Sequence, residues 1–121
     1  MKVHTTYMIL IIFICKLFLL NSCEKQNYDA DYTISFDKTI NIELEANWST
    51  GYSWHWENKD AINIVDTLKR EYVEEYRRGS TEKEIWTFIG KKKGDEKLVF
   101  VYKRAQETTY ENKKEFFIKV K

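Results

Sequence analysis

The sequence predicts an all-β protein, an immunoglobulin-like β-sandwich of about seven strands preceded by a cleaved signal peptide. From Tyr32 to the C-terminus, apolar residues alternate with polar ones, which is the period of half-buried strands. Turn-forming residues separate these short runs at the spacing typical of sandwiches. The aromatic content of 16% supplies large side chains for the core of a small domain.

Each expected strand has apolar residues at every second position. These residues are Ile34 and Phe36; Ile40, Ile42 and Leu44; Tyr52, Trp54 and Trp56; Trp86 and Phe88; Leu98, Phe100 and Tyr102; and Phe116, Ile118 and Val120. The segment between Trp56 and Glu84 is less regular. Residues 62–65 predict a short strand, and residues 69–76 fit a strand or a helix. We favour a strand there, because β-branched and aromatic residues dominate.

The first 22 residues are predicted to be a signal peptide. Lys2 provides a positive start, and Tyr7 to Leu20 is a short apolar run that Lys16 interrupts. A membrane-spanning helix needs roughly 20 apolar residues, so this run favours a signal over a span.

Leu20-Asn21-Ser22-Cys23 follows this run and resembles the lipobox of bacterial lipoproteins. The resemblance implies that Cys23 is acylated and becomes the first residue of the mature protein, at a bacterial envelope membrane on its periplasmic or cell-surface side. An ordinary secretory signal is the alternative. Residues 23–31 are then a polar tether, and residues 32–121 form the domain.

Charge and cysteine content narrow the function classes. Removal of residues 1–22 takes away Lys2, Lys16 and Cys15, which leaves 18 basic side chains against 19 acidic ones, a net charge of −1. That balance argues against nucleic acid as a partner. With Cys23 lipidated, no cysteine remains for a disulfide, a metal site or a thiol nucleophile. We expect a monomer without cofactor or metal.

No catalytic constellation is recognisable in the sequence. His4 lies in the signal, and His55 stands alone between two tryptophans of an expected strand. No phosphate-binding glycine loop and no metal-ligand spacing occurs. Carboxylates such as Glu43 and Glu45 fall on the solvent face of a strand. We therefore expect a binding protein rather than an enzyme.

The segment Leu44 to Trp56, LEANWSTGYSWHW, is the most informative stretch of the chain. It predicts a rigid loop between two strands, because Asn, Ser and Thr can bond the local backbone and glycine permits a positive φ. Trp54 and Tyr52 are expected to anchor the base of the loop in the core. The loop comprises Asn47, Trp48, Ser49, Thr50, Gly51 and Tyr52.

This stretch is similar to the Asn-Pro-Thr-Thr-Gly-Tyr-x-Trp signature of chagasin-type inhibitors of papain-like cysteine peptidases. The order of later segments also resembles that family, from Thr33 to the C-terminus. These segments are Gly79-Ser80-Thr81-Glu82 before Ile85-Trp86-Thr87-Phe88, then Lys92-Lys93-Gly94, then Leu98 to Gln106, and finally Glu115 to Val120.

The resemblance implies an immunoglobulin-like sandwich whose three loops occlude a peptidase cleft reversibly and without covalent reaction. Asn47 to Tyr52 match the central loop. Gly79, Ser80, Thr81 and Glu82 match the second loop, and Arg104, Ala105 and Gln106 match the third. The implied partner is a papain-like cysteine peptidase.

Several positions depart from the family pattern. Trp48 replaces a proline, Thr81 and Glu82 replace glycines, and Ala105 and Gln106 replace a proline and a tryptophan. These changes predict weaker inhibition, a different target, or binding rebuilt around Trp48, which either anchors a partner or folds back onto the sandwich. The alternative function is a non-inhibitory immunoglobulin-like binding or adhesion lipoprotein of the cell envelope.

Overall fold

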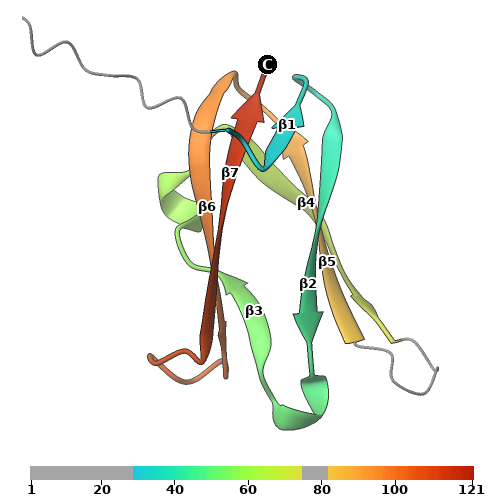
Figure 1. Cartoon of the computed structure of the whole chain (residues 1–121), viewed down its shortest axis with the longest axis vertical. Helices are drawn as coiled ribbons and strands as arrows, with labels where there is room; N and C mark the ends of the chain where they lie inside the picture. Colours follow the sequence, from blue (N-terminus) through green and yellow to red (C-terminus); the bar gives the residue numbers. More distant parts are fainter. Residues whose placement is uncertain (1–28, 75–81) are drawn as a thin grey trace, which may run out of the picture.

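Two β-sheets face each other in the computed structural model, which describes residues 29–74 and 82–121 (Figure 1). The first sheet has the order β1 (Tyr32–Ile34), β7 (Asn112–Val120), β6 (Gly94–Lys103) and β3 (Ser53–Trp56); the second has β2 (Thr39–Ala46), β5 (Glu82–Gly90) and β4 (Val65–Val73). Among the strand pairs of the described residues, β1–β7 is parallel and the other four are antiparallel. The predicted seven-stranded sandwich is therefore confirmed.

The core contains the apolar side chains that the alternation places on the inner faces. They are Ile34, Ile42, Leu44, Trp54, Trp56, Ile64, Val65, Trp86, Phe88, Leu98, Phe100, Ile118 and Val120. Aromatic rings from both sheets meet at its centre, with centroids 5.0 Å apart for Trp56 and Phe88 and 5.2 Å apart for Trp86 and Phe100. Such pairs each add about 0.5–1.5 kcal/mol beyond the burial of area.

The segment between β3 and β5 differs from the prediction at one point. Residues 62–65 do not form a separate strand. A short 3₁₀ turn, Lys59–Ala61, precedes them, and Val65 begins β4, which continues to Val73. The Ile64 carbonyl accepts hydrogen bonds from the Lys91 and Lys92 amides, and its side chain is buried, so this stretch closes one end of the core. The choice of strand over helix after Lys69 is confirmed as far as Val73.

Phe36 is a second correction, because β1 ends at Ile34 and the Phe36 side chain is 55% exposed. The chain turns here to reach the opposite sheet. Asp37 adopts a φ of 63°, and the Lys38 amide donates to the Ser35 carbonyl over 3.1 Å. A sharp turn ends the alternation that the sequence pattern extended through Phe36.

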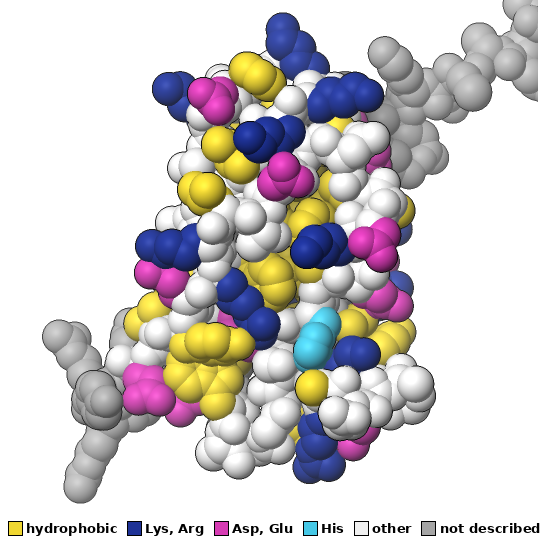
Figure 2. All heavy atoms as spheres, turned by 180° about the vertical axis from the view of Figure 1, so that it is seen from behind, with side chains coloured by type: hydrophobic (Ala, Val, Ile, Leu, Met, Phe, Trp, Pro, Cys, Tyr) yellow, Lys and Arg dark blue, Asp and Glu magenta, His cyan; other side chains and the backbone are white. Residues whose placement is uncertain are grey.

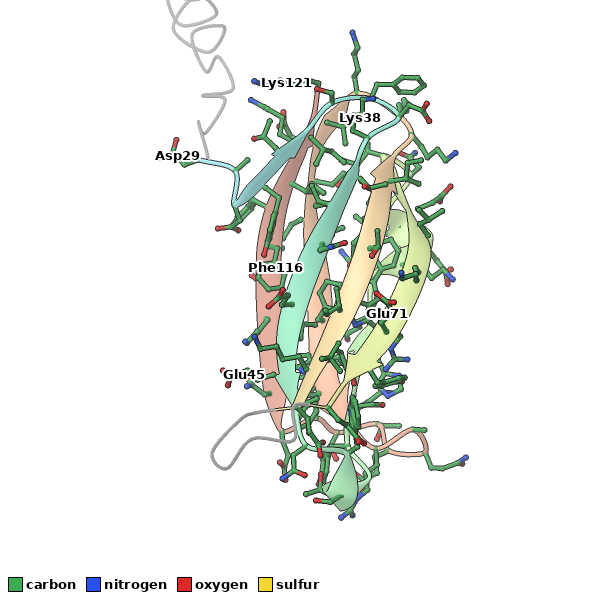
Figure 3. All side chains as sticks on the ribbon, turned by 90° about the vertical axis from the view of Figure 1, so that its right-hand side faces the viewer. Asp29, Lys38, Glu45, Glu71, Phe116 and Lys121 are labelled. Carbon is green, nitrogen blue, oxygen red and sulfur yellow. The ribbon has the colours of Figure 1, made fainter. Side chains whose placement is uncertain are left out.

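The described part of the chain begins at the end of the sandwich that also holds the C-terminus. Figure 3 places Asp29 and Lys121 near one end and Glu45 toward the other. The Phe117 amide donates to Asp31 Oδ2 over 2.7 Å, which fastens this entry segment to β7. Within residues 29–74 and 82–121 no helix has the length and apolarity to cross a membrane. The expected signal peptide and Cys23 lie outside the described residues.

Candidate functional site

Strands β2, β4 and β6 end, and strands β3, β5 and β7 begin, at the end of the sandwich opposite to the C-terminus (Figure 1). Strand register brings their ends together: Ala46 pairs with Glu82 and Ser53 pairs with Lys103. The register therefore places the central loop, the third loop and the first residue of β5 at the same end of the sandwich. Gly79, Ser80 and Thr81 of the second loop lie outside the described residues, whereas Glu82 is the first residue of β5.

The central loop is a short 3₁₀ turn, Trp48–Thr50, that is closed by its own side chains. Ser49 Oγ donates to Asn47 Oδ1 and Thr50 Oγ1 donates to the Asn47 carbonyl, both over 2.6 Å. Gly51 adopts a φ of 78°, and its amide donates to the Trp48 carbonyl over 3.0 Å. Both local expectations for this turn are confirmed, and the loop has a defined shape without a partner.

The base of the loop is attached to the first sheet by Trp54 and Tyr102. The Asn47 amide donates to the Tyr102 hydroxyl over 2.8 Å, and that hydroxyl donates to the Asn47 carbonyl over 3.2 Å. The indole of Trp54 is 1% exposed and donates to the Glu45 carbonyl over 2.8 Å. The expected anchoring in the core is confirmed for Trp54 but wrong for Tyr52, which stays at the surface, stacked on Tyr102 with centroids 5.5 Å apart. The alternation of the sequence predicts Tyr102 as a strand residue and gives no signal for its contact with the loop.

Trp48 folds back onto the second sheet. Its ring meets Tyr72 of β4 edge to face, with centroids 4.7 Å apart, and its backbone amide donates to Glu82 Oε2 over 2.9 Å. Beside it lies a shallow depression of about 440 Å³ lined by Trp48, Gly51, Tyr52, Ser53 and Tyr72. Figure 2 shows hydrophobic side chains grouped on the surface near this end, with charged side chains around them. The indole is half-buried and still borders the loop surface.

The third loop contacts the central loop through Arg104. Its guanidinium carbon lies 4.8 Å from the centroid of the Tyr52 ring, and its Nη1 lies 3.4 Å from Glu107 Oε1. A hydrogen bond from the Tyr52 hydroxyl to the Glu111 carboxylate raises the pKa of Tyr52. Arg104 is thus brought to the central loop, and the next two residues, Ala105 and Gln106, are exposed.

Behind the loop base lies a buried carboxylate, Glu84, that was not among the predicted site residues. Glu84 is fully buried and accepts hydrogen bonds from the Trp54 amide, Arg70 Nη2 and Trp86 Nε1 over 3.0, 2.9 and 3.2 Å. Arg70 Nη2 also donates to the Trp54 carbonyl over 3.0 Å. Since β3 is an edge strand, these two side chains of the opposite sheet satisfy the free amide and carbonyl of Trp54. Glu84 stands two and four positions before Trp86 and Phe88 in β5, so the strand alternation places it on the inward face. This alternation is the sequence signal that could have identified Glu84 as a buried residue.

His55 lies on β3 with its ring beside Ser53, whose Oγ is 3.1 Å from His55 Nε2. Partial burial and the positive charges of Lys103 and Arg70 lower the pKa of His55. The neutral ring is therefore favoured in the folded protein. Across the described ranges, no group of three or more His, Cys, Asp or Glu side chains is placed to hold a metal ion.

Two solved structures share this fold. The cysteine protease inhibitor EhICP2 from Entamoeba histolytica superposes with a TM-score of 0.57 at 18% identity, over 76% of this chain and 87% of that one. The solution structure of amebosin gives a TM-score of 0.53 at 29% identity, over 73% of this chain and 83% of that one. No match was found among curated proteins.

A family model agrees with the fold and with the loop sequence. The model described as Chagasin family peptidase inhibitor I42 matches residues 33–120, which is most of the chain and includes all the strands except the first residue of β1. Members of this family bind papain-like cysteine peptidases as inhibitors and are not enzymes. The sandwich, the preformed Asn47–Tyr52 loop and this match together show that the chain belongs to the chagasin family of peptidase inhibitors.

Proposed function

We propose that this protein is a reversible, non-covalent inhibitor of a papain-like cysteine peptidase and that the loop Asn47–Tyr52 blocks the active-site cleft. The observation that carries the proposal is the geometry of this loop, which is closed by internal hydrogen bonds and lies beside Glu82 of β5 and Arg104 of the third loop. A preformed loop loses little conformational entropy on binding, so it binds more tightly than a flexible loop that makes the same contacts.

The proposed mechanism is steric. Ser49 and Thr50 are exposed at the turn, and both hydroxyls already donate to Asn47. In a peptidase cleft they would cover the catalytic thiolate without presenting a strained bond for it to attack. The sequence after Cys23 contains no cysteine, so the domain itself offers no thiol for a disulfide with the enzyme. Occlusion is therefore proposed to be reversible.

A flanking contact is proposed to come from Arg104 of the third loop, which lies beside Tyr52. Ala105 and Gln106 are exposed but provide no aromatic anchor. Aromatic anchors at interface centres are typically worth about 2 kcal/mol or more. We therefore propose that inhibition is weaker than with an aromatic third loop. A non-inhibitory binding module of the cell envelope is the other outcome that these residues favour.

We also propose that Cys23 is lipidated and holds the protein at a bacterial envelope membrane. The point where the tether joins the sandwich supports this proposal. Asp29 lies at the end of the sandwich away from the central loop (Figure 3). The loops would then face away from the membrane. Cys23→Ser should release the protein into the soluble fraction, and palmitate labelling that persists in this variant would refute lipidation at Cys23.

The inhibition proposal is tested by titrating the mature domain, residues 24–121, against papain and a cathepsin-like peptidase. Gly51→Val should weaken inhibition at least about tenfold, because a left-handed backbone costs a β-branched residue more than the 1–2 kcal/mol of an ordinary residue. A Cβ at Gly51 would meet only Arg104 Nε, at 4.0 Å, so the cost is conformational rather than steric.

Gly51→Asn is the matched control, because asparagine tolerates a positive φ and should keep most of the potency. Equal potency of the valine and wild-type proteins would show that the loop is not the inhibitory element. Absence of inhibition by the wild type at high micromolar concentration would reject a general inhibitor and favour the envelope binding module.

A further inference from the structure

The central loop depends on a hydrogen bond that its own residues do not supply. Trp48 is the first residue of the 3₁₀ turn, and such first amides have no partner within the turn. Asn47, the residue before it, makes no side-chain cap, since its Oδ1 accepts from Ser49 Oγ instead. The Trp48 amide donates to Glu82 Oε2 over 2.9 Å. A carboxylate from another strand therefore takes the place of the cap.

Glu82 is well placed for this contact. It is the first residue of β5 and pairs in register with Ala46, the last residue of β2, from which the loop departs. The bond is partly buried, and hydrogen bonds to a charged acceptor are roughly twice as strong as neutral ones. The same residue of the loop is also held by its ring, which packs against Tyr72.

Two contacts therefore attach neighbouring loop residues to different sheets. Tyr102 of β6 binds both backbone groups of Asn47, and Glu82 of β5 binds the backbone of Trp48. A proline at position 48 would have no amide to donate, and a glycine at position 82 would have no carboxylate to accept. The tryptophan and the glutamate are thus chemically matched, because each makes the other's contact possible.

We propose that Glu82 is the positioning residue of the inhibitory loop and that it holds Trp48 and the following turn in the binding conformation. The hydrogen bond replaces the rigidity that a proline would give position 48. The effect of Glu82 on inhibition rests on the proposed inhibitory function, whereas its effect on the conformation of the loop does not. Glu82 acts through Trp48 and needs no contact of its own with the peptidase.

The structural content is tested by amide hydrogen exchange of the free protein, measured by NMR on the full chain. Glu82→Ala should raise the exchange rate of the Trp48 amide about tenfold or more, as expected for the loss of a hydrogen bond worth about 1.4 kcal/mol or more. The Asn47 amide, bound to Tyr102, should remain protected and serves as the internal reference. Glu82→Gln keeps an acceptor oxygen and should restore most of the protection.

The consequence is tested by inhibition of papain. Glu82→Ala should raise the inhibition constant about tenfold, with Glu82→Gln closer to the wild type. Glu43→Ala is the matched control, since Glu43 is an exposed carboxylate on neighbouring β2 that pairs with Lys83 at 3.4 Å. It should change neither measurement.

The outcomes separate this inference from the proposed function. An unchanged Trp48 exchange rate in Glu82→Ala would overturn the inference, as would unchanged inhibition despite faster exchange. A wild-type protein that inhibits no peptidase would instead reject the proposed function. Exchange that is faster in Glu82→Ala and restored in Glu82→Gln would still establish that Glu82 holds the loop.

Discussion

Replacement of Glu84 by alanine tests the link between the two sheets behind the loop. The Glu84 side chain is 0% exposed and accepts three hydrogen bonds, one of them from the guanidinium of Arg70. Glu84→Ala leaves the Trp54 amide and the Trp86 indole N–H without their acceptor. It also leaves the positive charge of Arg70 without its counter-ion.

These contacts set the expected loss in the free energy of unfolding. Breaking a buried ion pair costs about 3–5 kcal/mol. That figure already includes the cost of about 1–3 kcal/mol for each buried donor left without a partner. The Arg70 side chain is 29% exposed and can turn toward water, which places the loss near the lower value. We expect Glu84→Ala to lower the free energy of unfolding by about 3 kcal/mol and the melting temperature by about 10–25 °C.

Urea denaturation followed by tryptophan fluorescence measures this loss, because all four tryptophans lie in the sandwich domain. Glu43→Ala is the control: its carboxylate is 55% exposed, and such surface pairs contribute about 0–1 kcal/mol. The double variant Arg70→Met/Glu84→Leu should be more stable than Glu84→Ala, because it removes both charges together. A loss below about 1 kcal/mol in Glu84→Ala, similar to that of Glu43→Ala, would refute the proposed role of Glu84 as the link between the sheets.

Two further outcomes are expected. Tyr102→Phe removes the hydroxyl that binds both backbone groups of Asn47; it should weaken papain inhibition about tenfold while lowering the free energy of unfolding by only about 1 kcal/mol, measured on the same samples. An equal inhibition constant would show that this hydroxyl does not position the loop. The lowered pKa of His55 means that the unfolded chain takes up its proton first as the pH falls through the ordinary value of 6.5. The contribution of His55 to stability is therefore full above that pH and declines below it. Between pH 7.5 and 5.5, the melting temperature of His55→Gln should fall less than that of the wild type. Parallel losses in the two proteins would contradict this assignment.

Much of the fold could be predicted from the sequence because strand alternation is a local property. The inward phase of Ile42 and Leu44, and of Trp86 and Phe88, is visible in residues two positions apart and agrees with their burial. The prediction erred at Phe36, where a turn across to the other sheet ends the strand. Such a turn depends on where the next strand lies, which the alternation does not contain.

The central loop is encoded locally as well. Asn47, Ser49 and Thr50 are close enough along the chain to bond one another, and Gly51 is the residue that a positive φ requires. The sequence by itself therefore determined that a rigid turn exists between β2 and β3. Its similarity to chagasin-type inhibitors also led to the family that the match over residues 33–120 establishes.

Tertiary structure alone decided how that turn is held. The partners are far apart in sequence: Asn47 and Tyr102 by 55 positions, Trp48 and Glu82 by 34, and Trp54 and Glu84 by 30. The folded sheets determine which side chain reaches a free amide, because strand register sets the distances between residues on different strands. The same packing places the Trp48 ring against Tyr72. Neighbouring residues thus determine the turn itself, whereas its attachment to the sandwich comes from contacts that exist only once both sheets have formed.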